Sequence, residues 1–130
     1  MTAAVVILST AGSREEAARI ATALVEERLA ACVNLVDPIA SIYRWRGKVE
    51  RAAEVLMIIK TRRDRAARLT ARLCALHGYD VPEAIVLPIA SGSAPYLRWL
   101  AAETTTPRAT RRRRSSAASP PRRPPRRRAR

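Results

Sequence analysis

The only histidine in the chain, His77, lies three residues after Cys74 in a stretch with helical periodicity. Residues three apart share a helix face, so the two side chains form a C-x-x-H pair that is able to ligate a divalent metal ion. A structural role fits the same spacing, with His77 bonding the last helix carbonyl groups and Cys74 packing as a small apolar residue. The spacing leaves both interpretations open, because a structural tetrahedral site usually needs four ligands.

A second set of polar residues surrounds the start of the same helix. Lys60 and Arg62 flank Thr61, and the free N–H groups of a helix N-terminus favour anions. Glu83, directly after Pro82, is placed to pair with one of the basic side chains. The same residues fit an ordinary solvated basic face, so the sequence predicts either an anion-binding cleft or an exposed charged surface.

The motifs of several enzyme classes are missing from the chain. Gly12 alone after the first apolar run cannot form the glycine-rich turn of a dinucleotide site or a P-loop. The sequence also has no G-x-S-x-G motif, and a single histidine leaves few ways to build a Ser/His or Cys/His dyad. We therefore predict no catalytic residues and do not expect an enzyme.

Four extended segments position these residues. Two are continuous apolar runs, typical of central strands covered on both faces: residues 3–8 and 55–59. Two contain a proline, which cannot donate to a strand ladder and therefore indicates a sheet edge or a bulge: residues 32–45, with Pro38, and 84–90, with Pro88.

Helices separate the strands. Ser13 and Glu16 form a capping box at the start of the first, and Thr61 with Asp64 predicts a similar cap for the second. A short helix is expected from about residue 95 to 102. The order βαββαβ, with two central and two edge strands, predicts an α+β, ferredoxin-like sandwich with a long hairpin and a short C-terminal helix.

The hairpin around residues 41–48 is too long for its own core. An arm of about 13 residues spans roughly 43 Å, whereas a helix of about 15 residues covers ~22 Å. Tyr43 and Trp45 are two apart and so share one face of this overhang. Because the central strands are apolar on both faces and the helices cover only one, we expect a homo-oligomer with Tyr43 and Trp45 in its interface.

Charge divides the chain into two parts. Residues 107–130 hold 11 arginines and no acid, whereas residues 1–106 hold the other 14 basic residues and all 11 acids. We predict a folded domain over 1–106 and a disordered Arg/Pro-rich tail over 107–130. Such a tail either stays solvated without a partner or contacts nucleic acid or anionic lipid without sequence readout.

The chain has no transmembrane-length apolar run, and its N-terminal run lacks the basic flank of a signal peptide. These features predict a cytoplasmic location. The two cysteines are too few for a disulfide framework, and we expect free thiols.

Four motifs occur in a consistent order: A-A-C-V-N at 30–34, S-I-Y-R-W-R-G-K at 41–48, K-T at 60–61 and H-x-Y-x-V-P-E at 77–83. Together they make the chain, from about residue 5 to 100, resemble the CutA divalent-ion tolerance proteins. The resemblance implies a ferredoxin-like subunit, a tight homotrimer whose hairpins reach neighbouring subunits, and a link to tolerance of divalent cations, chiefly copper.

The resemblance also implies which positions face copper. Family members with a copper site use a cysteine at the end of the first strand and two adjacent histidines at the end of the second helix. The matching positions here are Ser9, Leu76 and His77, so one ligand of three is kept. No cofactor is required by this interpretation, and copper or another divalent cation is the expected ligand.

Two functions follow from the sequence. The first is a non-enzymatic homotrimer associated with divalent cation tolerance, with His77 and Cys74 as metal ligands. The alternative is a signalling trimer, similar in architecture to PII-type proteins, that binds a small anion or a protein partner in clefts between subunits. Lys60, Arg62 and Glu83 would serve that cleft.

Overall fold

The computed structural model describes residues 1–105. The predicted disordered tail lies outside the described residues, so that prediction stays open. The described chain runs through eight elements: β1 Ala4–Ala11, α1 Arg14–Glu26, β2 Cys32–Trp45, β3 Lys48–Arg62, a 3₁₀ turn Arg63–Arg65, α2 Ala66–Leu76, β4 Ile85–Pro88 and α3 Ala94–Glu103.

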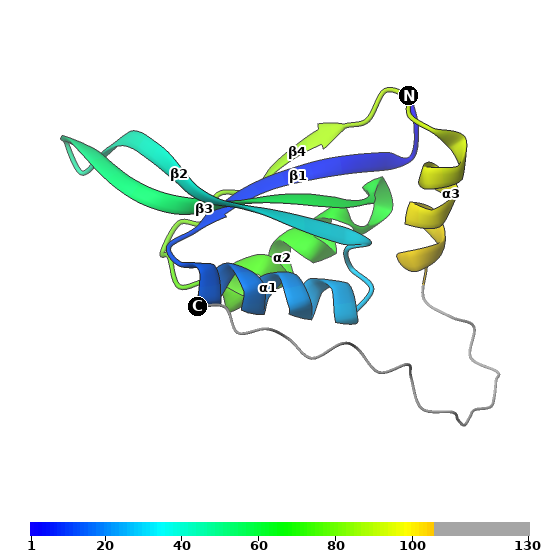
Figure 1. The fold of residues 1–130 in the computed structure, drawn as a ribbon, viewed down its shortest axis with the longest axis horizontal. Helices are drawn as coiled ribbons and strands as arrows, with labels where there is room; N and C mark the ends of the chain where they lie inside the picture. Colours follow the sequence, from blue (N-terminus) through cyan, green and yellow to red (C-terminus); the bar gives the residue numbers. More distant parts are fainter. Residues whose placement is uncertain (106–130) are drawn as a thin grey trace.

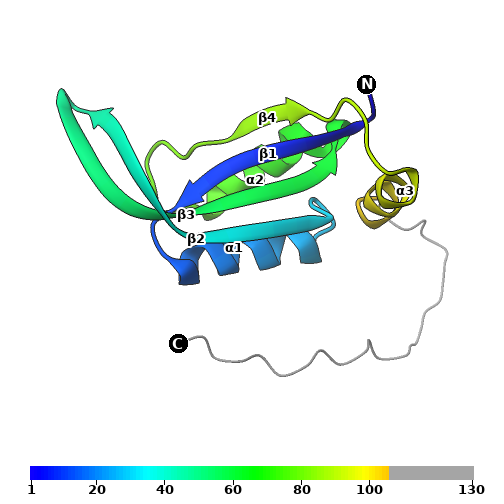
Figure 2. The same cartoon turned by 45° about the horizontal axis from the view of Figure 1, so that its top comes forward.

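The four strands form one antiparallel sheet in the order β2-β3-β1-β4. The apolar strands β1 and β3 are central, and the proline-containing strands β2 and β4 are the edges, as the sequence predicts. Helices α1 and α2 lie together on one face of the sheet, and α3 lies at the end opposite the hairpin (Figures 1 and 2). This arrangement confirms the ferredoxin-like α+β fold.

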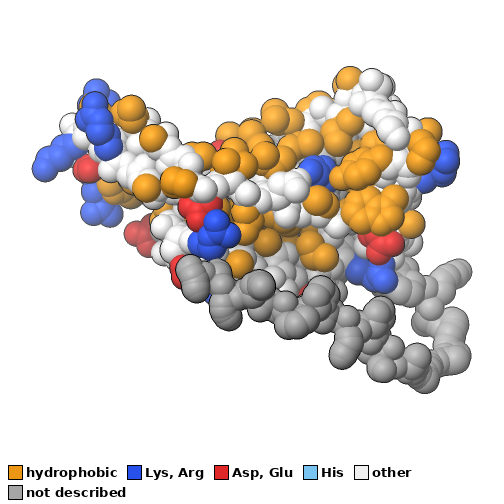
Figure 3. All heavy atoms as spheres, viewed as in Figure 1, with side chains coloured by type: hydrophobic (Ala, Val, Ile, Leu, Met, Phe, Trp, Pro, Cys, Tyr) orange, Lys and Arg blue, Asp and Glu red, His pale blue; other side chains and the backbone are white. Residues whose placement is uncertain are grey.

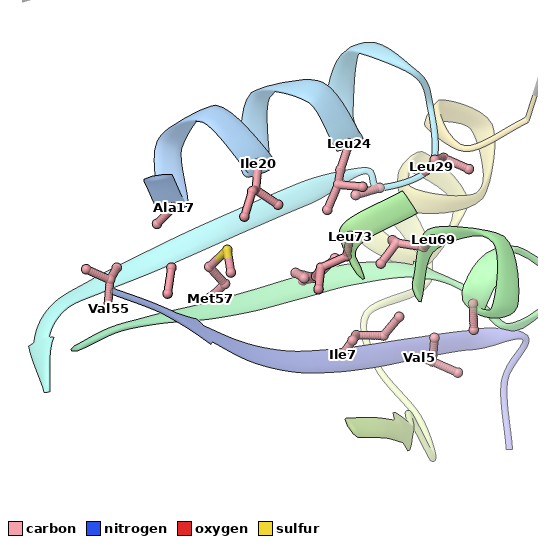
Figure 4. Close-up of a cluster of buried hydrophobic side chains, with 14 residues drawn as sticks. Val5, Ile7, Ala17, Ile20, Leu24, Leu29, Val55, Met57, Leu69 and Leu73 are labelled. Atoms are coloured by element: carbon pink, nitrogen blue, oxygen red, sulfur yellow. The ribbon is translucent and has the colours of Figure 1, made fainter. Parts of the chain in front are cut away.

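The core lies between the helices and the inner face of the sheet (Figure 4). Alternate residues of β1 and β3 point to this side, because side chains alternate between the two faces of a strand. Ser13 is the N-cap of α1, and its hydroxyl accepts the N–H of Glu16, which is one half of the predicted capping box. The Glu16 carboxylate accepts the N–H groups of Gly12 and Gly78 instead of that of Ser13. The fully buried large side chains of the cluster are Val5, Ile7, Ile20, Leu24, Val55, Met57, Ile59, Leu69 and Leu73.

The capping box predicted for the second helix is wrong. Thr61 is fully buried on the inner face of β3, and its hydroxyl donates to the carbonyl of Leu29 at 2.6 Å. The helix instead starts through the 3₁₀ turn, whose N-cap residue Arg62 makes no side-chain cap. Asp64 lies 3.4 Å from the Arg62 guanidinium on the surface. Thr61 therefore ties β3 to the α1–β2 connection and does not start a helix.

The β2–β3 hairpin extends well past the helices (Figure 1). Its strands pair from Cys32↔Lys60 to Trp45↔Lys48, with one irregularity where Pro38 interrupts β2. Arg46 and Gly47 both have positive φ, 53° and 80°, in the two-residue turn, which suits the right-handed twist of the strands. The predicted overhang is therefore present, and it extends past the ends of α1 and α2 (Figure 1).

The outer face of the sheet carries apolar residues that α1 and α2 leave uncovered, and α3 packs only on its end, where Leu100 is buried with Ala4. Strand register places these side chains together, and we call them the open face: Val6, Leu8, Val36, Leu56, Ile58, Ile85 and Leu87. Val36, Ile85 and Leu87 are 41%, 47% and 43% exposed. Figure 3 shows hydrophobic side chains gathered over the sheet and around α3. Within residues 1–105, no helix is long and apolar enough to span a membrane.

Replacing Thr61 by valine should lower the free energy of unfolding by about 1 to 3 kcal/mol, because the buried Leu29 carbonyl loses its hydrogen bond. The matched control is Asp64→Asn, which should change it by less than about 0.5 kcal/mol, since the Asp64 side chain is 68% exposed. Chemical denaturation of both variants measures this. The opposite ranking would restore the capping box and contradict the buried role of Thr61.

Candidate functional site

A cavity of about 560 Å³ lies at the base of the hairpin. Its walls come from the end of β1, from both hairpin strands and from the segment between α2 and β4. Figure 2 shows that segment passing beside the base of the hairpin on its way to β4. The lining residues are Thr10, Ser41, Ile42, Tyr43, Trp45, Glu54, Tyr79, Asp80, Val81 and Glu83. We call this cavity the hairpin pocket.

The hairpin pocket is acidic and aromatic. It is lined by three carboxylates, Glu54, Asp80 and Glu83, and by no lysine, arginine or histidine. Among residues 1–105, neither Asp80 nor Glu83 forms an ion pair. Tyr43 and Trp45 supply aromatic surface and are 43% and 42% exposed in the single subunit. The pocket thus combines uncompensated negative charge with aromatic rings.

Tyr79 links the loop to the hairpin. Its hydroxyl donates to Oε2 of Glu54 at 2.6 Å, which joins the segment after α2 to β3. Partial burial raises the pKa of the Tyr79 hydroxyl well above its usual range, and the hydrogen bond to Glu54 and the Glu54 and Glu16 charges raise it further. The hydroxyl therefore stays protonated and keeps donating, and Glu54 keeps a second oxygen for another partner.

His77 holds the backbone next to the pocket. Its Nδ1 accepts the N–H of Tyr79 at 3.0 Å, so the proton of the neutral ring lies on Nε2. Nε2 then donates to the carbonyl of Thr10 at 2.7 Å. The His77 side chain is fully buried and its ring lies 4.6 Å from that of Tyr79. Both ring nitrogens are therefore used to join the end of β1 to the loop after α2.

Glu16 makes a second connection between the same two segments. Its Oε1 accepts the N–H of Gly12 at 3.3 Å and its Oε2 accepts the N–H of Gly78 at 2.7 Å. A Cβ atom at Gly78 would lie 2.8 Å from Oε2, so the close approach of the carboxylate requires glycine there. Glu16 and His77 together fix the loop that carries Tyr79.

The residues that match the family's copper ligands do not fit a copper site. The ring nitrogens of His77 are both hydrogen-bonded to main-chain groups. Cys74 is exposed, and Ser9, where a cysteine would supply a thiolate, is buried with a hydroxyl that is a weaker ligand for copper. Within the described residues, no three His, Cys, Asp or Glu side chains are arranged to hold a metal ion. The predicted His77–Cys74 site stays a prediction without geometric support.

Of the three residues predicted for an anion cleft, Glu83 lies apart from Lys60 and Arg62. Lys60 donates to the side chain of Asn34 on the open face. Arg62 contacts Asp64 at 3.4 Å and the carbonyl of Thr104 at 3.4 Å, near α3. Glu83 instead lines the hairpin pocket, at the opposite end of β1 and β3.

The pocket contains residues that the sequence did not single out, namely Glu54, Asp80 and Thr10. Tyr79 and Asp80 lie within the H-x-Y-x-V-P-E motif, so this motif already pointed to that part of the pocket. Glu54 precedes the apolar run of β3 and has no local signature. Glu54 is positioned in the pocket by two long-range interactions: its strand pairing with Ile39 and the hydrogen bond from the Tyr79 hydroxyl.

The fold and the pocket define a ferredoxin-like subunit with an overhanging hairpin and a ligand-sized cavity at its base. A family model described as CutA1 divalent ion tolerance protein matches residues 5–103, which is most of the chain. The chain belongs to this family.

Similar proteins extend across bacteria, plants and archaea. The divalent-cation tolerance protein CutA of Thermus thermophilus is 52% identical over 99 residues, covering 76% of this chain and 96% of that protein. Protein CutA, chloroplastic, of Arabidopsis thaliana is 48% identical, covering 77% of this chain and 55% of that protein. The crystal structure of CutA from Xylella fastidiosa has a TM-score of 0.79 at 39% identity, covering 80% of this chain and 100% of that chain. The structure of the periplasmic divalent cation tolerance protein CutA from Archaeoglobus fulgidus has a TM-score of 0.76 at 41% identity, covering 78% and 99%.

Replacing Glu16 by alanine should lower the free energy of unfolding by about 2 to 3 kcal/mol, because two backbone N–H groups lose a charged acceptor. Glu15→Ala is the matched control: Glu15 lies in the same first turn of α1 and is exposed, so its loss should change stability by less than about 0.5 kcal/mol. Thermal and chemical denaturation compare the two. Equal effects would show that only the helix dipole is involved.

Proposed function

We propose that this chain acts as a homotrimer that contributes to tolerance of divalent cations, copper among them, by binding and not by catalysis. Family membership supports the link to divalent cations. The open face carries the proposal of assembly, because a single subunit leaves this apolar surface uncovered. The number of subunits comes from the family resemblance, whereas the physical argument requires only that other copies cover the face.

The energetics of the open face favour assembly. Burying a Val, Leu or Ile side chain contributes roughly 1.5 to 3 kcal/mol, and Ile85 and Leu87 are both more than 40% exposed in one subunit. Ile58 and Leu8 lie between them and β2 in the same register. Contiguous apolar patches of this kind mark interaction sites. A closed assembly in which equivalent faces meet would cover all of these side chains at once.

The overhanging hairpin supplies a second contact. Tyr43 and Trp45 lie beyond the reach of the helices of their own subunit and keep more than 40% of their surface exposed. A neighbouring subunit that packed on the hairpin would bury aromatic side chains, which contribute most to interface energetics. We therefore keep Tyr43 and Trp45 as the proposed hairpin residues of the trimer interface.

The cation belongs to the assembled protein in this proposal, and not to His77 and Cys74 of one subunit. His77 would have to give up the Tyr79 N–H or the Thr10 carbonyl to bind copper. The alternative, an anion cleft between subunits, would have to bring Lys60 and Arg62 of one subunit close to Glu83 of another, because they lie at opposite ends of the sheet within one subunit. We also propose a cytoplasmic location, although the names of two relatives place those proteins in the chloroplast and the periplasm.

Placing a charge on the open face should dissociate the assembly. We expect Ile58→Asp to give a particle of lower mass than the parent, because a buried, unpaired carboxylate at an interface is strongly unfavourable. Val25→Asp is the matched control, since Val25 is 41% exposed on α1, away from the open face. Light scattering of both variants at micromolar concentration measures this. Parent mass for Ile58→Asp would contradict an interface on this face.

Titration calorimetry with Cu(II) and Zn(II) tests where the cation binds. We expect His77→Ala to bind both ions with the parent's affinity. Removing a ligand, or even a group that supports one, would instead weaken binding about tenfold or more. Cys74→Ser, which keeps the size of the exposed side chain, reports on the thiol separately. Light scattering confirms that each variant is assembled. A large loss in His77→Ala, with unchanged mass, would make His77 a ligand.

A further inference from the structure

We propose that the hairpin pocket binds the guanidinium group of an arginine side chain. Three features of the described residues carry this inference: the uncompensated acidic lining, the aromatic walls, and a volume of about 560 Å³, which lies within the roughly 300 to 1,000 Å³ range of ligand sites. None of them depends on where the divalent cation binds.

The charge of the pocket favours a cation. Glu54, Asp80 and Glu83 are three of only 11 acidic residues in a chain of net charge +14, and no basic residue shares the lining with them. Other acids of the domain are already paired: Glu27 with Arg72 and Asp37 with Arg14, for example. A concave surface that keeps one sign of charge raises the local concentration of opposite charge.

The arrangement of the carboxylates favours an extended organic cation over a metal ion. The three side chains surround the cavity without forming a group that could hold an ion, and Oε2 of Glu54 already accepts from Tyr79. A metal ion needs ligands that converge within about 2 to 2.6 Å of one point. A guanidinium group instead presents five N–H donors over a plane and can reach separate carboxylates.

The aromatic residues select guanidinium over ammonium. Tyr43, Trp45 and Tyr79 provide flat faces beside the carboxylates, and arginine stacks on such faces while its fork bonds a carboxylate with two N–H groups. The hairpin already holds one contact of this type, because the guanidinium carbon of Arg46 lies 5.4 Å from the Trp45 ring centroid. Lysine, with a compact and strongly hydrated charge, would gain less from the same walls.

Two sources can supply the arginine. The chain itself has 11 arginines between residues 108 and 130, and a tethered ligand is present at an effective concentration in the millimolar range. The 25 residues after Thr105 extend to at most about 85 Å, whereas the 15 residues of β3 span about 50 Å. The other source is an arginine-containing segment of another protein. The chemistry at the pocket is the same in both cases.

The pocket shares Tyr43 and Trp45 with the proposed interface. A neighbouring subunit that bordered the pocket would leave room for the arginine, whereas one that filled the cavity would exclude it. The proposed assembly and the proposed arginine site can therefore be tested independently. Light scattering measures the mass of the assembly, and a ligand titration measures binding in the pocket.

Fluorescence of Trp45 gives a direct test. Trp99→Phe leaves Trp45 as the sole tryptophan, because the chain contains two. The probe is a blocked tetrapeptide, acetyl-Gly-Arg-Arg-Gly-amide, titrated at physiological salt into the full chain and into a chain ending at Thr106. The shorter chain keeps every residue that the structure describes and the whole family match. The peptides with lysine or citrulline in place of arginine are the controls.

We expect a saturable change in Trp45 fluorescence with the arginine peptide in the shorter chain, several-fold weaker binding of the lysine peptide and none of the citrulline peptide. Asp80→Asn with Glu83→Gln, which keeps side-chain size, should weaken binding at least tenfold. Weaker binding to the full chain than to the shorter one identifies the chain's own arginines as the ligand, and equal binding identifies an external one. No saturable change, equal binding of arginine and lysine peptides, or full binding by the double variant would overturn the proposal.

Discussion

The structure depends on one constraint: its sheet is apolar on both faces, but α1 and α2 cover only one, and α3 packs on no more than the end of the other. The inner face is closed by α1 and α2, and the core there is complete within one subunit. The open face and the overhanging hairpin stay uncovered within one subunit, and we propose that other copies of the chain cover them. The same constraint sets the position of the hairpin pocket, which lies where the part of the sheet covered by helices ends and the overhanging hairpin begins.

The pocket is held by polar contacts that sequence position alone would not suggest. Glu16 and His77 join the end of β1 to the loop after α2, and both use main-chain partners, so the loop is set in one conformation. Tyr79 then reaches Glu54 across the hairpin. These contacts use the only histidine of the chain for positioning. The same use explains why the family's copper-ligand positions are poorly suited to copper here.

Much of the fold could be predicted, because its determinants are local. Pro38 and Pro88 identify the edge strands, the apolar runs of β1 and β3 identify the central ones, and Ser13 identifies the start of α1. Thr61 was misassigned because its partner, the Leu29 carbonyl, lies 32 residues away in sequence. The site was predictable only in part. Lys60 and Arg62 lie together at one end of β3, whereas Glu83 lies beside the other end, and this separation depends on the register of the whole sheet.

The molar mass of the full chain in solution, measured by sedimentation over a dilution series from micromolar concentration, tests the central claim most directly. We expect a single species of three times the 14.4 kDa chain mass that persists on dilution, because the open face stays covered. A stable, monodisperse species of 14.4 kDa would contradict it, since the apolar open face would then be tolerated in water without a partner.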